Sequence, residues 1–400
     1  MTQPVARRMQ AVERALRPFL RVMRESTYAR RMGTSGIMDF MAGNPQEPPL
    51  PEVVEVIARW TRPRSRDWFA YRVDESRARA AAAAGLRERL EVEVDPDDVV
   101  LTRGAAGGLA AALAALTEPG DQVIFLSPPW FFYEAMILAT GAEPVRVRVD
   151  PTTFNIDVEA LEEAISPRTR VVILNTPNNP TGRIYPPETL EQVAAVIERR
   201  AARSAQPIAI ISDESYSRIL FDGRRFHSPA RFSPNCVLVH TTSKSTLTPG
   251  QRLGFVALPK TMPGRERIRD ALRLAILVQG IAVPDAVMQF AFADLEPLCI
   301  DLAHLQRKRD RMVEALRQHG YQLDIPEGAF YLLPRSPLAD DIAFAELLAR
   351  RDVFVLPGSV VEMPGYFRIS LTASDEMIER ALPIFAAALV TSAAVAGSQG

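Results

Sequence analysis

Residues 171–182 read Val-Val-Ile-Leu-Asn-Thr-Pro-Asn-Asn-Pro-Thr-Gly, a short apolar run followed directly by polar and proline-rich sequence. Four consecutive large apolar residues fit a strand that is buried on both faces, as in a parallel sheet. The two X-Pro steps and the final glycine restrict the backbone that follows. We therefore expect a buried strand whose end presents the Asn179 amide from a rigid loop.

The same alternation of short apolar runs and helical stretches continues on both sides of this segment. Strands are expected at 99–102, 123–126, 144–149, 171–175, 208–212, 237–241 and 254–257. Helices are expected between them at 105–116, 131–140, 158–164 and 188–200. The alternation predicts an α/β fold with a mostly parallel seven-stranded sheet between helices. Sheets of this kind bind ligands at the carboxyl ends of their strands.

The two ends of the chain have a different pattern. The N-terminal end contains an arginine-rich amphipathic stretch, and the C-terminal end combines long helical stretches with two short apolar runs. We expect helices at 6–24, 300–319 and 375 to about 395, with strands at 329–333 and 353–356. This predicts a smaller α+β domain formed by residues 1–43 and 286–400, beside a large domain of residues 44–285.

Composition excludes several classes of protein. The chain has 400 residues, 47% hydrophobic and 24% charged, and a net charge of −1 that gives no footprint for nucleic acid or membranes. It has neither an apolar run long enough to span a bilayer nor a secretory signal. Cys236 and Cys299 lie in apolar stretches without metal-type spacing. We expect buried, reduced thiols, a cytoplasmic location and no metal.

Lys244 is one of only three lysines among 47 basic residues, and it follows the apolar run at 237–241. A guanidinium stays protonated and cannot form an imine, whereas a partly desolvated amine can. Lys260 and Lys308 lie in ordinary turn and helix-surface contexts. Lys244 therefore indicates chemistry, with a solvated turn lysine as the alternative.

Other polar residues also follow the expected strands. Gly104 opens an alanine-rich helix whose free amides would favour a phosphate, and Thr241 and Arg252 could add a hydroxyl and a bidentate clamp. A glycine turn that packs a helix on the sheet is the alternative. Asp213 ends a strand in Ile-Ser-Asp-Glu-Ser-Tyr-Ser, residues 211–217. A carboxylate there needs a cation, such as the protonated pyridine nitrogen of pyridoxal phosphate, unless it caps a helix.

In this order, the motifs resemble those of the class I/II aminotransferases of the fold-type-I pyridoxal-phosphate superfamily, from about Met38 to Leu382. The resemblance implies that Lys244 forms a Schiff base with pyridoxal 5′-phosphate. It also implies that Asp213 binds the pyridine nitrogen and that Asn179 and Tyr216 bind the phenolic oxygen. The residues implied at the phosphate are Gly104, Ala105, Ala106, Thr241, Arg252 and, from a partner subunit, Tyr71.

The remaining implied residues contact the cofactor ring or the substrate. Trp130, in the segment Ser-Pro-Pro-Trp-Phe-Phe-Tyr at 127–133, would stack on the ring. Arg368 would bind the substrate carboxylate, with Gly43 and Asn179 beside it. Met38, together with Ile37 and Phe40, would line the pocket. The phosphate loop lacks a hydroxyl and the usual sequence after Tyr71 is missing, which are departures from the family pattern.

The resemblance implies a homodimeric enzyme of amino-acid metabolism that exchanges an amino group between an L-amino acid and a 2-oxo acid. Lys244, Asp213 and Tyr216 would be catalytic, with Lys244 as general base. Decarboxylation, elimination, replacement or cyclisation of an amino acid would use the same residues. A cofactor-sensing regulator would need an appended DNA-binding domain. A nicotinamide dehydrogenase would need a Gly-x-Gly-x-x-Gly motif, which the glycines at 104–108 do not form. The arginines at 21, 24, 30 and 31 fit either an acidic substrate or an ordinary charged surface.

Overall fold

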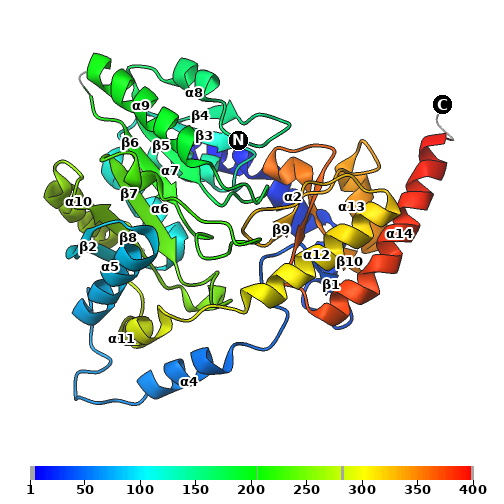
Figure 1. Ribbon diagram of the computed structural model, residues 1–400, viewed down its shortest axis with the longest axis horizontal. Coiled ribbons are helices and arrows are strands. Elements are labelled where there is room, and N and C mark those ends of the chain that lie inside the picture. Colours follow the sequence, from blue (N-terminus) through cyan, green and yellow to red (C-terminus); the bar gives the residue numbers. More distant parts are fainter. Residues whose placement is uncertain (1–4, 205, 281–282, 398–400) are drawn as a thin grey trace.

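The computed structural model describes residues 5–204, 206–280 and 283–397. Its central element is a seven-stranded sheet with the order β2-β8-β7-β6-β5-β3-β4 (Figure 1). The strands are β2 (Val94–Thr102), β3 (Gln122–Ser127), β4 (Glu143–Arg148), β5 (Thr169–Asn175), β6 (Ala209–Asp213), β7 (Cys236–Thr241) and β8 (Gly254–Pro259). β8 is antiparallel to both neighbours, and the other pairs are parallel. The predicted α/β fold and its seven strands are confirmed.

Helices cover both faces of this sheet because its strands are apolar on both sides. In β5, Val171 and Ile173 pack on one face, and Val172 and Leu174 on the other. The first face carries α6 (Gly104–Leu116), α7 (Tyr133–Thr140) and α10 (Arg265–Val278). The second carries α5 (Ser76–Leu90), α8 (Val158–Ala164), α9 (Pro187–Ser204) and α11 (Ala286–Leu295).

A smaller unit forms from both ends of the chain (Figure 1). β1 (Met38–Asp39) pairs in parallel with β10 (Val353–Phe354), while β11 (Leu356–Pro357), β12 (Phe367–Ser370) and β9 (Tyr331–Leu332) form an antiparallel sheet. Three helices complete it: α12 (Leu302–His319), α13 (Asp341–Ala349) and α14 (Asp375–Gly397). α11 instead packs against α5 and α4 (Pro51–Trp60). We therefore propose the same two-domain division, but with α11 in the large domain.

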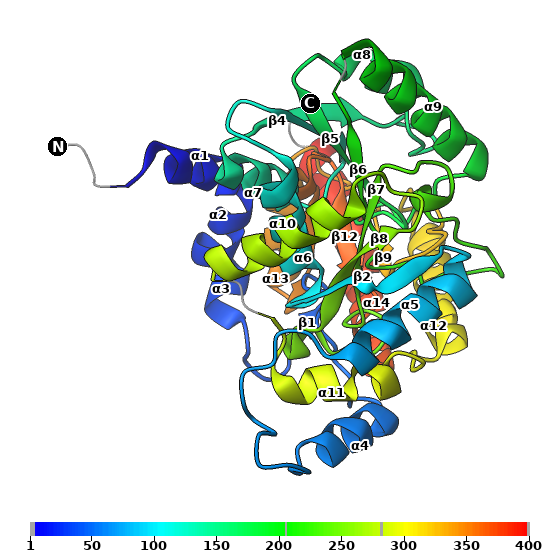
Figure 2. The same cartoon turned by 90° about the vertical axis from the view of Figure 1, so that its left-hand side faces the viewer.

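The single helix expected at 6–24 is wrong, because the structure has two helices there. α1 (Arg7–Ala15) and α2 (Arg17–Glu25) are separated at Leu16, and α3 (Thr27–Arg31) follows. Pro18 lies in the first turn of α2, where its missing N–H is tolerated, but it would interrupt a continuous helix. The break lets α1 pack on α7 while α2 turns away from it (Figure 2).

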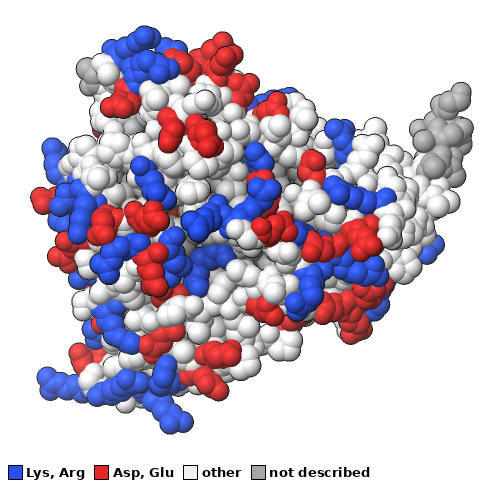
Figure 3. Space-filling view, viewed as in Figure 1, with Lys and Arg blue, Asp and Glu red and all other residues white. Residues whose placement is uncertain are grey.

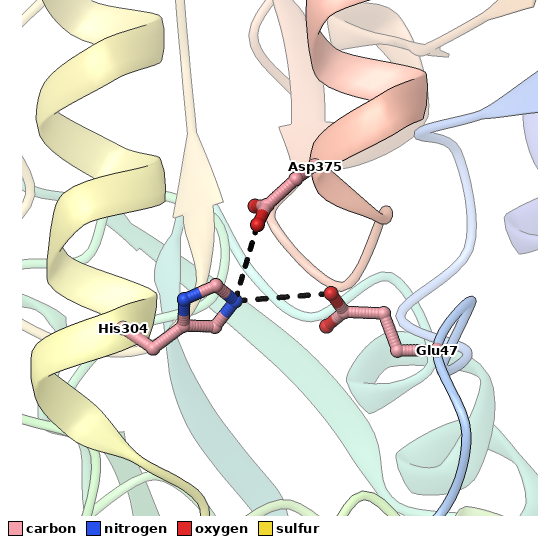
Figure 4. A group of neighbouring side chains, drawn as sticks. All are labelled: Glu47, His304 and Asp375. Carbon is pink, nitrogen blue, oxygen red and sulfur yellow. Dashed lines mark ion pairs between the residues drawn. The ribbon is translucent and has the colours of Figure 1, made fainter.

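Lys308 is buried, so its expected position on a helix surface is wrong. Its Nζ donates to Glu47 Oε2 at 2.5 Å and to the Ala373 carbonyl at 2.9 Å. His304 Nε2 lies 3.7 Å from a carboxylate oxygen of both Glu47 and Asp375 (Figure 4). This cluster ties the loop after β1 to α12 and the start of α14.

Charged side chains of both signs are mixed over the face shown in Figure 3. This agrees with the formal net charge of −1. In the described part of the chain, no helix has the length and apolar character needed to cross a membrane.

Candidate active site

A cavity with about 570 Å³ of empty space lies at the carboxyl ends of the parallel strands. Asn175, Asp213 and Thr241 are the last residues of β5, β6 and β7, and all three line it. The N-terminus of α6 closes one side. The lining residues are Ala105, Ala106, Leu109, Trp130, Asn175, Asn179, Asp213, Ser215, Tyr216, Thr241, Ser243, Lys244, Pro249 and Arg252. The sheet thus brings together most of the residues expected at a cofactor.

Asp213 is a buried carboxyl at this cavity, only 5% exposed. Tyr133 Oη donates to its Oδ2 at 2.7 Å, and the Ser215 amide and hydroxyl donate to its Oδ1 at 3.1 and 2.6 Å. Burial raises the pKa of Asp213, while these hydrogen bonds and the charge of Lys244 act in the opposite direction. No described cation lies within ion-pair distance of it. A positively charged ligand group would therefore be stabilised here.

Lys244 is distinguished from the other two lysines by its surroundings. Lys260 lies 3.6 Å from Glu93, and Lys308 is bonded to Glu47, whereas Lys244 has no acid partner among the described residues. Its Nζ is 5.7 Å from the ring centroids of both Tyr216 and Phe330. The amine therefore faces the cavity and is available for chemistry.

The α6 end of the cavity has the properties of an anion site. Arg252 donates to the carbonyls of Pro249 and Arg103 at 2.7 and 3.1 Å and has no described carboxylate partner. A Cβ on Gly104, whose φ is +70°, would lie 2.7 Å from Arg252 Nη2. Burial, and then the charge of Arg103, lower the pKa of Arg252. Free amides at a helix N-terminus beside a guanidinium favour a phosphate.

A second cavity, with about 860 Å³ of empty space, adjoins the first and shares five lining residues with it: Trp130, Asn179, Tyr216, Lys244 and Pro249. Arg368, only 4% exposed, lines it. Its Nη1 donates to Asn179 Oδ1 and its Nη2 to the Met41 carbonyl, both at 2.9 Å, while Nε has no partner. A buried guanidinium without a carboxylate suits an anionic ligand.

Gly43 also lines the second cavity, whereas Ile37, Met38 and Phe40, which were predicted to line the pocket, do not. A Cβ on Gly43 would lie 2.6 Å from Tyr331 Oη, which explains the glycine. Met38 was expected to line the pocket, and this is wrong, because β1 pairs with β10 and carries it into the small-domain core. Ile37 and Phe40 are likewise buried in the core, and Met41 lines the cavity instead.

Some site residues escaped the sequence analysis. Tyr133, three residues after Trp130 and at the start of α7, donates to Asp213, and only its place in the aromatic segment at 127–133 drew attention to it in the sequence. Ser243 donates its amide to Thr241 Oγ1 at 3.1 Å. Tyr331 comes from the other domain and carries no local signal. Tyr71 lies outside the first cavity of its own chain and is fully exposed.

Glu214 follows Asp213 but faces away from the chemistry. It is buried and accepts hydrogen bonds from Ser212 at 3.0 Å and from Ser228 at 2.5 Å, while its Oε2 has no partner. Burial raises the pKa of Glu214 to about 8. Because the folded-state pKa is raised, the stability linked to this carboxyl is complete below about pH 4.5 and is lost as pH rises through about 8.

We expect Glu214→Gln to flatten this dependence, because glutamine keeps the shape but cannot ionise. Chemical unfolding should show that the variant loses less stability between pH 5 and pH 9 than the wild type, by a few kcal/mol. Glu198→Gln, at an exposed position on α9, serves as the control. An unchanged slope in Glu214→Gln would contradict the prediction.

Comparison with known proteins extends over nearly the whole chain. A family model described as aminotransferase class I and II matches residues 35–385. The aspartate/prephenate aminotransferase of Thermus thermophilus is 32% identical to this chain. The alignment covers 90% of this chain and 92% of the relative. The aspartate aminotransferase of Thermotoga maritima is 31% identical, with 86% of this chain and 89% of the relative covered.

Solved structures are also similar to this chain. An amino transferase from Eubacterium rectale has a TM-score of 0.86 and 28% identity, covering 98% of this chain and 100% of its own. The aspartate aminotransferase from Thermus thermophilus with maleate has a TM-score of 0.81 and 29% identity, covering 97% and 100%. The similarity therefore includes both the large sheet and the smaller unit.

Proposed function

The chain belongs to the class I and II aminotransferase family, and we propose that its two adjoining cavities bind pyridoxal 5′-phosphate and an amino acid. It is an aminotransferase with a fold-type-I architecture, and it transfers amino groups between amino acids and 2-oxo acids. Family membership therefore favours amino-group transfer over decarboxylation, elimination or cyclisation. The roles of individual residues in this reaction are our proposal.

The residues of the first cavity fit pyridoxal phosphate. Arg252 and the amides of α6 suit the phosphate, and the buried Asp213, which has no ion-pair partner in the described part of the chain, suits a protonated ring nitrogen. Asn179 and Tyr216 would hold the phenolic oxygen, and Trp130 would face the ring. When bound, the cofactor supplies an electron-withdrawing ring that stabilises negative charge on the substrate α-carbon.

The residues of the chain then have separate tasks. Arg368 binds the substrate carboxylate with the guanidinium nitrogen that lacks a partner, and Gly43 leaves room for it. Lys244 Nζ, which forms no ion pair with a described carboxylate, accepts the proton from the substrate α-carbon. Asp213 keeps the ring nitrogen protonated. Tyr216 Oη, 3.1 Å from Tyr331 Oη, orients the phenolic oxygen.

The observation that carries the proposal is the juxtaposition in one cavity of the buried Arg368 guanidinium and the Lys244 amine, neither of which pairs with a described carboxylate. The test is to supply purified protein with pyridoxal phosphate and a panel of L-amino acids, and to identify products by mass spectrometry. We expect each accepted donor to yield its 2-oxo acid. Carbon dioxide, an olefin or a cyclic product instead would contradict the proposed reaction.

We also propose a homodimer in which Tyr71 reaches the phosphate of the partner subunit's cofactor. Its support is an exposed apolar patch on one side of the large domain, formed by Phe69, Tyr71, Val73, Leu274, Leu277 and Val278. Asp74 accepts a hydrogen bond from Arg273 at 2.9 Å, which places the loop beside α10. A cytoplasmic location and a role in amino-acid metabolism stay predictions from the sequence.

Leu277→Asp should disrupt this dimer, because it places a charge in the centre of an apolar interface. Sedimentation should give about the mass of two chains for the wild type and of one chain for the variant. The variant should also retain pyridoxal phosphate less tightly. Val390→Asp, at an exposed position on α14, is the control and should stay dimeric. A monomeric wild type would contradict the proposal.

A further inference from the structure

The second cavity is lined by both polar and apolar residues. Arg368, Lys244 and Asn179 are among the polar ones. A group of the other lining side chains is what we call the apolar wall: Phe19, Met23, Tyr28, Met41, Phe131 and Leu356. A substrate whose carboxylate lies on Arg368 would direct its side chain toward this wall.

The apolar wall is assembled from separate elements. Phe19 and Met23 are four residues apart on α2 and therefore share one helix face. The Phe19 ring stacks on Phe131 with centroids 4.7 Å apart. Leu356 comes from β11. Methionine side chains adapt readily and make favourable contacts with aromatic rings, so the wall suits a bulky apolar group.

Among the described residues, Arg368 and Lys244 are the only cations that line the cavity. The arginines at 21, 24, 30 and 31, which were compatible with an acidic substrate, do not line this cavity. Most of them interact with other residues. Arg21 lies 3.6 Å from Glu25, and Arg31 lies 2.7 Å from Asp352. Arg30 donates to the Glu25 carbonyl at 3.0 Å. A second carboxylate on the substrate would find no guanidinium among them.

Tyr28 provides the only polar group of the apolar wall, and its proton is already used. Its Oη donates to Asp39 Oδ2 at 3.0 Å. Asp39 is buried and also accepts from the Met41 amide at 2.9 Å. A substrate carboxylate placed beside Tyr28 would lose its hydration and lie near the buried carboxyl of Asp39. Such burial is strongly unfavourable.

We propose that this aminotransferase acts on amino acids with a large uncharged apolar side chain, aromatic or long aliphatic, and that aspartate and glutamate are poor substrates. The inference rests on the proposed function, because it takes Arg368 as the carboxylate site. The proposed substrate differs from the aspartate that appears in the names of the relatives. The proposal is based on the apolar wall of this chain and not on those names.

The direct test is the half-reaction with one amino donor at a time, measured as 2-oxo acid released by the pyridoxal-phosphate-loaded enzyme. We expect phenylalanine to exceed alanine and aspartate by roughly 100-fold or more in kcat/KM. Aspartate reacting as well as phenylalanine would overturn the inference and leave amino-group transfer intact. Absence of product from every donor would instead contradict the proposed function.

A binding measurement tests the inference without turnover. Calorimetry with the loaded enzyme should show that 3-phenylpropanoate binds at least roughly tenfold more tightly than maleate. Tighter binding of maleate would mean that a cation from outside this chain completes the cavity, and it would overturn the inference. This binding measurement tests the inference even if no amino acid reacts.

Two variants separate specificity from general damage to the site. Met23→Arg should lower kcat/KM for phenylalanine at least roughly tenfold and raise it for aspartate, while Met9→Arg, exposed on α1, should change neither. Phe19→Ala should lower the value for phenylalanine but leave alanine nearly unchanged. Equal losses for phenylalanine and alanine in Phe19→Ala would show a merely structural role and contradict the assignment of the wall.

Discussion

Lys244→Ala is expected to nearly abolish amino-group transfer, with a loss of about 10²–10⁴-fold in turnover. The variant removes the only lysine amine of the described chain that has no acid partner and that lines both cavities. Alanine is smaller and uncharged, so the surrounding sheet should fold normally. The measurement is formation of the donor's 2-oxo acid with saturating pyridoxal phosphate, the best amino donor and a second 2-oxo acid as amino acceptor.

Lys260→Ala is the matched control for this variant. Lys260 is 52% exposed and lies 3.6 Å from Glu93, on the surface. It should therefore keep wild-type turnover. Residual activity above about one per cent in Lys244→Ala would assign the proton transfer to another group, since a positioned base contributes about 10²–10⁴-fold.

Asp213→Asn is expected to lower turnover by about 10²–10³-fold, because asparagine cannot hold a proton on the ring nitrogen by charge. The same substitution should not lower the stability of the protein. The cofactor-free variant should be at least as stable as the cofactor-free wild type, because a buried carboxylate without a cation is costly. Steady-state kinetics and chemical unfolding measure the two effects.

Asp270→Asn, at an exposed carboxylate on α10, is the control and should leave activity unchanged. If Asp213→Asn were both inactive and much less stable, Asp213 would be a structural residue held by Tyr133 and Ser215. Loss of activity with retained stability supports the proposed role.

The seven-stranded sheet could be predicted from the sequence because the relevant signals there are local. Each strand of a parallel sheet shows as a short apolar run, and the polar residue after it lies at the same edge as its counterparts. Asn179, Asp213 and Lys244 follow three such runs, and the structure brings them into one cavity. Their order along the chain was therefore enough to place them together.

The residues that the sequence misplaced depend on contacts between distant parts of the chain. Met38 pairs with Val353, and Lys308 is held by Glu47, so neither environment has a local pattern. Phe19 reaches the second cavity only because the N-terminal helices break at Leu16. The substrate pocket is built from such contacts, which explains why motifs identify the chemistry but not the substrate.

The most direct test of the account is to locate the cofactor on the chain. The loaded enzyme is treated with borohydride, which reduces an imine between cofactor and lysine to a stable secondary amine. The protein is then digested and examined by mass spectrometry. We predict the reduced cofactor on the peptide that contains Lys244, with Lys260 and Lys308 unmodified. Cofactor on either of those lysines, or none on Lys244, would contradict the account.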